Sequence, residues 1–310
     1  MLFVTFHGGK PDKNPHLNNV HAYDKDGKKI TASILQRADG VTPDELRGIY
    51  LINGILYLVN ANKEQNSVLC YKGAGTDYKF AGKFITGDSC AGILHPFDFA
   101  FDDAGHCFVS SQDTNVVTRL KISADGKTGA LAPIAPALPP DGKFLPGTFV
   151  ASNKSLKPAT TPVAPPQGLE FSDDGAKKHS VRGVVWANGA LYVADQPARR
   201  VKVYDKNGKF LGQSNGVESP VHLTVWKGSL YVSGGDEIQS AKLPNPPGNF
   251  ELVAIKDLRL KNSSGMAFTD KGHFYVASRT QRKIFKFDSD FRPMKFDCDL
   301  PDDPEFLLHL

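Results

Sequence analysis

Cysteine is scarce and widely spaced in this sequence, and this excludes several kinds of small cross-linked or metal-bound domain. The four cysteines are Cys70, Cys90, Cys107 and Cys298. No Cys-x-x-Cys pair occurs, which excludes a zinc knuckle, and four cysteines in 310 residues are too few for a disulfide scaffold. We expect free, buried thiols, with one disulfide as the alternative.

Long hydrophobic runs are also missing. No apolar stretch reaches the roughly 18 residues of a membrane-spanning helix, so we expect no membrane partner. Residues 1–7 lack the charged region and long apolar stretch of a secretory signal peptide, and they read as a strand. This favours a cytoplasmic location, and secretion is the alternative if a leader has been removed.

Charge of one sign is not concentrated anywhere in the chain. The 37 lysines and arginines exceed the 33 acidic residues by four, and they form no dense basic run and no basic helix. Nucleic-acid binding needs a concentrated basic patch, so we expect no nucleic-acid partner. Hydrophobic residues make up 40% of the chain and charged residues 23%, which is enough for a packed core.

What the sequence does contain is one short sequence motif that is repeated six times. Each copy is a short aliphatic and aromatic segment, usually ending in valine. Most intervals are about 40 to 50 residues, the size of one four-stranded propeller blade, and one interval contains a long insertion. The copies lie at residues 2–4, 56–58, 107–109, 191–193, 230–232 and 274–276.

Each copy has the neighbours expected in a blade. The segment before it predicts an inner strand and a turn, as at 48–54 and 183–189. The segment after it alternates apolar and polar residues, as at 201–204, which is typical of a third strand. Turns such as Asp26-Gly27 and Asn207-Gly208 then predict a hairpin into an outer strand.

The two ends of the chain complete each other. Residues 304–310 have the character of an inner strand with no second strand after it, whereas residue 1 opens directly on a second strand. Pairing them closes the ring and removes exposed sheet edges. The chain is therefore predicted to be an all-β, six-bladed β-propeller of four-stranded antiparallel blades, forming one domain over 1–310. Two separate β-domains are the alternative, and they would leave both end segments unpaired.

The blade phrases at 191–195 (LYVAD) and 202–209 (KVYDKNGK) carry a family resemblance. They are similar to those of NHL-repeat propellers and, more distantly, to the gluconolactonase, strictosidine-synthase and peptidyl-hydroxyglycine amidating-lyase group. The resemblance covers nearly the whole chain except 127–180. It implies the architecture, and propellers of this kind include enzymes, binding modules and RNA readers.

The insertion at about 127–180 lies between blades three and four. It holds nine of the 21 prolines, which lack the donor that a sheet ladder needs, so extended loop is expected over much of it. Residues 147–151 are predicted to supply an outer strand of blade three, and 167–171 another short strand. A binding lid and a peripheral excursion are both consistent with this composition.

Alignment of the copies predicts a ring of polar side chains around one mouth of the central channel. At the starts of the inner strands stand Arg47, Asp98, Arg182, His222, Ser264 and Glu305, with His95 just upstream of Asp98. At the exits of the second strands stand His7, Asn60, Gln112, Asp195, Asp236 and Arg279, with Asn62, Asp113 and Gln196 beside them. Such polar residues are unusual in a β core unless they are paired or functional.

Glycine fills the aligned inner-strand slot in three copies, at Gly48, Gly183 and Gly265, while Asp98 and His222 depart from that pattern. With Glu305 they form a candidate site for a divalent metal such as zinc or calcium. The family resemblance also implies metal ligands from separate blades, although this sequence reproduces neither known ligand set and lacks the Glu-Gly-Pro opening of gluconolactonases. The alternative is a channel of ion pairs such as Arg47–Asp98 and Arg182–Glu305.

The arginines Arg47, Arg182 and Arg279 suggest an anionic ligand, because guanidinium groups fork onto carboxylates and phosphates. Salt bridges to the nearby acids are again the alternative. The sequence thus predicts a small-molecule hydrolase or lyase in which His222, Asp98, Arg47 and Arg182 are catalytic and the remaining ring residues bind the ligand. No organic cofactor is implied. The alternative function is a non-catalytic propeller that binds a protein, a peptide or an anionic small ligand on the same face.

Overall fold

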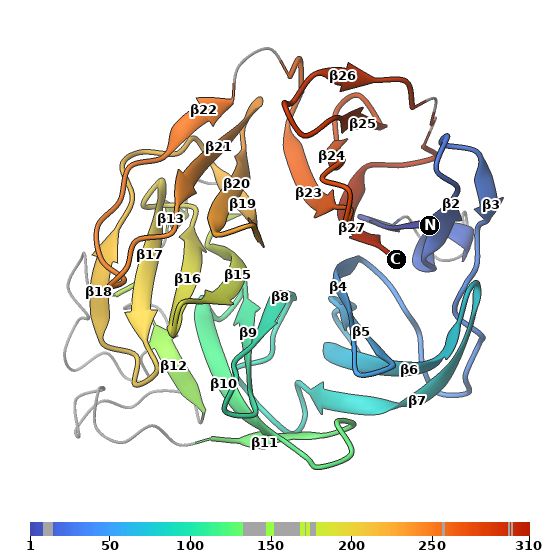
Figure 1. Ribbon diagram of the computed structural model, residues 1–310. Helices are drawn as coiled ribbons and strands as arrows, with labels where there is room; N and C mark the ends of the chain where they lie inside the picture. Colours follow the sequence, from blue (N-terminus) through green and yellow to red (C-terminus); the bar gives the residue numbers. More distant parts are fainter. Residues whose placement is uncertain are drawn as a thin grey trace.

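The computed structural model describes residues 1–8, 15–132, 147–151, 168–170, 172–173, 178–255, 258–296, 298 and 300–310. Six antiparallel sheets stand around a common centre, as Figure 1 shows, and the predicted propeller is confirmed. The described residues include one short 3-10 helix, η1 (Pro15–Asn18). None of their helices is long and apolar enough to cross a membrane.

In every blade the strands follow one another from the centre of the ring outward. Blade 1 is β27 (Pro304–His309), β1 (Leu2–Phe6), β2 (His21–Tyr23) and β3 (Lys29–Thr31), and blade 2 is β4 (Leu46–Ile52), β5 (Ile55–Asn60), β6 (Ser67–Ala74) and β7 (Asp77–Thr86). Blade 3 is β8 (Pro96–Phe101), β9 (His106–Ser111) and β10 (Val116–Ile122), with both β11 (Gly129–Leu131) and β12 (Thr148–Ala151) on its outer edge, and blade 4 is β15 (Val181–Ala187), β16 (Ala190–Asp195), β17 (Arg200–Asp205) and β18 (Phe210–Gln213). Blade 5 is β19 (Pro220–Trp226), β20 (Ser229–Gly234), β21 (Glu237–Lys242) and β22 (Val253–Ile255), and blade 6 is β23 (Ser263–Phe268), β24 (Phe274–Ser278), β25 (Lys283–Phe287) and β26 (Pro293–Met294). A separate pair is formed by β13 (Ser172–Asp173) and β14 (Lys178–His179).

The ring is closed as the sequence predicts, by pairing β27 with β1 in blade 1. Leu2 lies opposite His309 and Val4 opposite Leu307. The second strands β5, β16 and β24 are buried along their whole length, because each is covered on both faces by neighbouring blades. This explains why they read as unbroken aliphatic and aromatic segments. All four cysteines are free and buried, as expected.

The insertion is described only in part. Residues 147–151 pair with β10 as β12, with Val116 opposite Ala151, which confirms the predicted outer strand of blade 3. Residues 168–170 form no strand, and the remaining residues of the expected strand at 167–171 lie outside the described part of the chain. Residues 133–146 and 152–167 also lie outside the described part of the chain, and the choice between a binding lid and a peripheral excursion depends on them.

The inner strands approach one another most closely at the glycine slots. A Cβ on Gly183 would stand 2.7 Å from the Val221 carbonyl oxygen, and one on Gly265 would stand 2.6 Å from the Phe306 Cα. A Cβ on Gly48 would stand 2.8 Å from an Asp98 carboxylate oxygen. Glycine in blades 2, 4 and 6 therefore faces a larger residue in blades 3, 5 and 1, and the pattern repeats every second blade.

We expect Gly183→Ala to lower the free energy of unfolding by about 1–3 kcal/mol, the usual cost of overpacking. The atoms that its Cβ would meet belong to the backbone of β19, which cannot rotate away. Gly216→Ala is the matched control, since no atom lies within 4 Å of its Cβ. Urea unfolding measures both variants, and an equal effect in the two would contradict the close approach at Gly183.

Candidate functional site

A carboxylate surrounded by cations stands at the channel mouth where blades 1, 2 and 6 meet. Glu305, at the start of β27, lies 2.8 Å from Arg47 Nη1 and 2.9 Å from Arg279 Nη2. His7 Nδ1 lies 3.2 Å from the same Glu305 oxygen. Glu305 is only 1% exposed and Arg47 only 4%, so this pair is almost completely removed from water, whereas Arg279 and His7 are partly exposed at its outer side.

Burial by itself would raise the pKa of Glu305, but the charges of Arg47 and Arg279 and the hydrogen bond to His7 outweigh it. Together they lower the pKa to about 2. Glu305 is therefore ionised at any ordinary pH and neutralises only one of the two arginines that touch it. Glu45, just before β4, lies 3.1 Å from Arg47 Nη2 and supplies a further negative charge.

Arg182, on β15, is held differently from the other two arginines. Its Nε donates to Gln196 Oε1 at 2.9 Å, and its Nη1 donates to Gln112 Oε1. Its guanidinium carbon lies 5.2 Å above the centre of the Phe97 ring. No carboxylate of the described residues lies within salt-bridge distance of it, and its Nη2 donates to no described protein atom. Arg182 thus forms no direct ion pair with a described residue, and the charges of Glu305 and Asp113 act on it only from beyond contact distance.

Burial, together with the charges of Arg47 and Arg279, lowers the pKa of Arg182 to about 10. The group still carries its charge at neutral pH, and the shift shows that the three predicted arginines lie close enough to repel one another. An anion bound beside Arg182 would relieve both the repulsion and the desolvation.

His95 stands between two carboxylates at the same mouth. Its Nε2 lies 3.1 Å from Glu45 Oε2 and its Nδ1 lies 3.4 Å from Asp113 Oδ1. Its backbone N–H donates to Asn66 Oδ1 at 2.6 Å, which fixes the loop before β8. Burial alone would lower the pKa of His95, but the hydrogen bonds to Asp113 and Glu45 outweigh it and raise the pKa above its ordinary value.

Asp98 lies inside the channel wall, where it connects three blades. Its Oδ2 accepts from the Val184 N–H at 3.1 Å, and its Oδ1 accepts from the Tyr50 hydroxyl at 3.1 Å and the Phe99 N–H at 2.9 Å. Burial raises the pKa of Asp98 to about 8. Its oxygens are thus occupied by donors of the inner strands.

His222 has the equivalent position two blades further on. Its Nδ1 accepts from the Met266 N–H of blade 6 at 3.1 Å, so Nε2 carries the proton in the neutral ring. The ring contacts Phe306 edge-on, with centroids 4.7 Å apart. Burial lowers the pKa of His222 to about 3, and the ring is neutral at pH 7.

The structure does not bring the predicted metal ligands Asp98, His222 and Glu305 together in one group. In the part of the chain that the structure describes, no group of three or more His, Cys, Asp or Glu side chains is placed to hold an ion. Glu305 is enclosed by arginines, and Asp98 and His222 accept hydrogen bonds from the backbone. The predicted ion pairs are also wrong: Arg47 pairs with Glu305 rather than Asp98, and Arg182 contacts glutamines rather than Glu305.

His222→Phe should change how stability depends on pH. Because the pKa of His222 falls from 6.5 to about 3 on folding, its neutral form stabilises the protein above pH 6.5, and this is lost as pH falls from 6.5 toward 3. This fall in the pKa of His222 corresponds to a free-energy cost of about 5 kcal/mol for protonating the ring in the folded protein rather than in the unfolded chain. At pH 7 the variant should be less stable by about 1–3 kcal/mol, since the Met266 N–H loses its acceptor. Urea unfolding between pH 4 and 7 should show a flatter profile in the variant, and parallel profiles would contradict this.

The other predicted ring residues have partners other than the three arginines. Asn60 accepts from the Asp44 N–H at 2.8 Å and fastens a loop of blade 2. Asp195 pairs with the buried Lys202 at 2.8 Å inside blade 4. Asp236 contacts Lys261 at 2.6 Å on the surface, and Ser264 donates to the Pro304 carbonyl at 2.7 Å.

Sequence reasoning missed Glu45 and Ser219, which stand directly before inner strands. Ser219 accepts from Gln196 Nε2 at 2.8 Å and so supports the glutamine that holds Arg182. Glu45, His95 and Ser219 all have a positive φ, of 46°, 52° and 47°. This left-handed residue before the inner strand recurs in several blades, and the repeated position is the signal that could have identified them.

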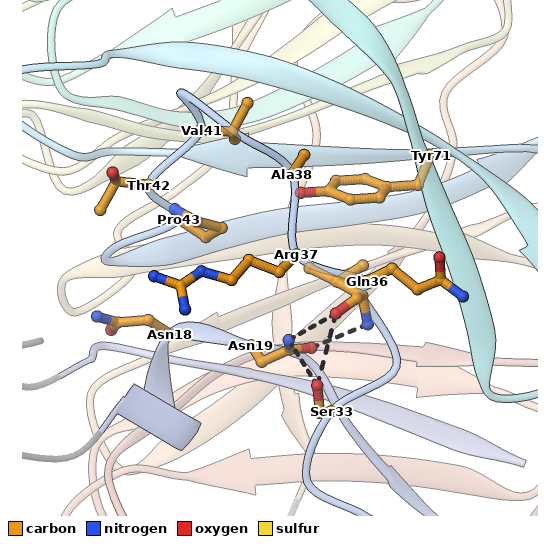
Figure 2. Close-up of a pocket in the computed structure, with 11 residues that line it drawn as sticks. Asn18, Asn19, Ser33, Gln36, Arg37, Ala38, Val41, Thr42, Pro43 and Tyr71 are labelled. Carbon is orange, nitrogen blue, oxygen red and sulfur yellow. Dashed lines mark hydrogen bonds between the residues drawn. The ribbon is translucent and has the colours of Figure 1, made fainter.

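A separate hollow of about 370 Å³ lies beside the segment that connects blade 1 to blade 2. Figure 2 shows Arg37 reaching across it and Asn19 donating to Ser33 Oγ, a bond of 2.9 Å. None of the predicted site residues lines it. The channel mouth, where acids, histidines and arginines converge, therefore remains the candidate site.

Comparison with known proteins supports the fold and assigns no family. No family model and no curated protein matches the chain. A protein in the crystal structure of a nidogen/laminin complex is 13% identical, with 99% of this chain and 96% of that chain covered and a TM-score of 0.58. A gluconolactonase from Xanthomonas campestris is 14% identical, with 84% and 78% covered and a TM-score of 0.54. A streptogramin B lyase is 13% identical, with 83% and 70% covered and a TM-score of 0.50.

Proposed function

We propose that this chain is a propeller enzyme, a hydrolase or a lyase, that binds an anionic small molecule at the channel mouth. The observation that carries the proposal is Arg182, a guanidinium of the mouth that has no carboxylate partner among the described residues and an unused Nη2 donor. Arg47 and Arg279 lie close enough to influence its pKa. An anionic group of the substrate would pair directly with the unused Nη2 donor of Arg182.

His95 supplies acid–base chemistry next to this anion site. Its ring is hydrogen-bonded on both sides by Glu45 and Asp113, so it holds its proton to higher pH than an isolated histidine. In the hydrolysis of an ester or lactone, water would add to the carbonyl carbon and lose a proton to the Glu45 or Asp113 carboxylate beside His95. His95 would turn one N–H from its carboxylate to the departing oxygen and protonate it as the C–O bond breaks, and Arg182 would offset the negative charge that develops on the substrate. In an elimination, the carboxylate would instead take the proton from the carbon next to the breaking bond. Asp98 and His222, which the sequence suggested as catalytic, have no part in this scheme.

The solved structures with this fold include a gluconolactonase and a streptogramin B lyase. They support the proposal at the level of fold, because they are propellers of comparable size that carry out hydrolysis or elimination. The nidogen/laminin complex represents the alternative, a propeller that binds a protein. The acids and the histidine at the mouth favour the enzyme, because protein-binding centres are depleted in Glu and Asp and rich in aromatic residues and arginine.

The test combines binding and turnover. Calorimetry with gluconate, 6-phosphogluconate and inorganic phosphate should detect binding, and Arg182→Gln should weaken it about 10- to 100-fold, since a charge-assisted hydrogen bond contributes about 1.5–3 kcal/mol. Turnover is measured as proton release from gluconolactone and 6-phosphogluconolactone. We expect His95→Gln to reduce turnover while anion binding remains.

Arg37→Gln is the matched control, because this exposed arginine lines the hollow of Figure 2 and not the mouth. It should leave both binding and turnover unchanged. Anion binding without turnover of either lactone would overturn the enzymatic part of the proposal in favour of a binding propeller. Anion binding of equal strength in Arg182→Gln and the parent protein would overturn the assignment of the site.

A further inference from the structure

A small aromatic pocket opens on the face opposite the channel mouth, between blades 5 and 6. It lies where β19 and β23 end and where the turns after β19, β23 and β25 meet. Its volume is about 180 Å³. Four aromatic rings and two lysines line it, namely Trp226, Tyr231, Phe268, Phe291, Lys227 and Lys242.

The aromatic rings of this pocket form a fixed arrangement. Trp226 and Phe268 are parallel within 1°, with centroids 5.3 Å apart, although they belong to different blades. Phe268 is also stacked on Phe274 at 4.4 Å, and Tyr231 lies 4.8 Å from Phe268. Rings held in this way on strands form a preorganised wall against which another ring packs with little further loss of entropy.

The two lysines give the pocket a positive charge. Lys227 Nζ lies 5.3 Å above the Trp226 ring. Neither Lys227 nor Lys242 has an ion-pair partner among the described residues. The acids nearest in sequence to Phe291 are Asp288 and Asp290, and both contact Arg292. The lysine charges are therefore available to a ligand.

We propose that this pocket is a second binding site, which takes one aromatic ring that carries a carboxylate. Its volume suits one ring with a small substituent, since an engineered cavity of about 150 Å³ binds benzene. Tyr231, Phe268 and Phe291 pack on the ring, and Lys227 and Lys242 meet the carboxylate. The lysines disfavour a cationic ligand, and a neutral one leaves their charges uncompensated. This site is independent of the chemistry at the mouth.

Tryptophan fluorescence tests the proposal directly, because the chain has only two tryptophans. In a Trp186→Phe background, Trp226 is the only fluorophore of this kind, and it lines the pocket. The probe is benzoate, with benzyl alcohol as its neutral counterpart. We expect saturable quenching by benzoate, at least tenfold weaker binding of benzyl alcohol, and about tenfold weaker benzoate binding in Lys227→Gln/Lys242→Gln.

Arg182→Gln in the same background separates the two sites, and it should leave the benzoate titration unchanged. Loss of quenching in Arg182→Gln, equal affinity for benzoate and benzyl alcohol, or unchanged affinity in the double lysine variant would each overturn the proposal. If Trp186→Phe does not fold, calorimetric titration of the parent chain with the same two probes, with and without the lysine substitutions, gives the same comparison.

Discussion

Lys202→Met is expected to lower the free energy of unfolding by about 3–5 kcal/mol, the cost of removing one partner of a buried ion pair. Lys202 is 1% exposed and Asp195 is 0% exposed, and Lys202 Nζ lies 2.8 Å from Asp195 Oδ2. Lys202 Nζ also donates to the Gly168 carbonyl at 2.5 Å, which ties the end of the insertion to blade 4. Without the lysine, the buried Asp195 carboxylate has no countercharge among the described residues and keeps only the Glu170 N–H as a hydrogen-bond donor, at 3.0 Å.

The cause of this loss can be tested with two companion variants. Adding Asp195→Leu to Lys202→Met should recover much of the lost stability, because the stranded charge is removed. Lys286→Met is the control, since this lysine is also buried but donates only to the Lys25 carbonyl and pairs with no carboxylate of the described residues. Urea unfolding at pH 7 measures all of them, and equal losses in Lys202→Met and Lys286→Met would contradict the explanation.

Glu305→Gln should destabilise the protein by a similar amount, about 3–5 kcal/mol at pH 7. The substitution keeps the shape of the side chain but leaves Arg47 and Arg279 facing each other without the carboxylate that now lies within 3 Å of both. Because Glu305 belongs to β27 and Arg47 to β4, the substitution weakens the contact between blade 1, which closes the ring, and blade 2. Glu45→Gln is a milder comparison, since Glu45 is 26% exposed and touches only one of these arginines.

The same variant should differ from the parent protein in its response to acid. The pKa of Glu305 is depressed on folding from 4.5 to about 2, so its contribution to stability is complete above pH 4.5 and is lost as pH falls toward 2. Glu305→Gln lacks this contribution at every pH. Thermal unfolding followed from pH 7 to 2.5 should therefore show a difference between the two proteins that narrows below pH 4.5, and a constant difference would refute the assigned pKa.

The architecture could be predicted because the sequence of each blade contains a recognisable pattern of strands. Residues 191–193 and 201–204 show the continuous and the alternating strands of blade 4, and 304–310 indicates an inner strand with no partner after it. These are local signals, since burial on both faces selects the residues of a second strand wherever it occurs. Ring closure then follows from the unpaired ends.

The sequence indicated which strand ends carry the polar side chains of the candidate site, but not the contacts that these side chains make. Asp98 and His222 are correctly predicted as departures from glycine, but their partners are the backbone N–H groups of Val184 and Met266 in the next blade, which no side-chain pattern reveals. The predicted partner of Arg47 is the wrong acid: Arg47 pairs with Glu305 of β27, and it lies in a stretch of β4 where the strand register shifts between Leu46 and Ile49. Such directions depend on backbone geometry that the sequence does not display.

The glycine slots have a consequence for how this ring can be rebuilt. Gly48, Gly183 and Gly265 allow close backbone approach at three junctions, while at two of the junctions between them a buried side chain accepts from the backbone of the next inner strand, as where Asp98 meets Val184 and His222 meets Met266. Two kinds of joint therefore alternate around the circle. If a single blade were moved to the neighbouring position in the ring, both of its junctions would be of the type that its inner strand does not fit. The smallest unit that can be transplanted or duplicated intact is therefore a pair of adjacent blades.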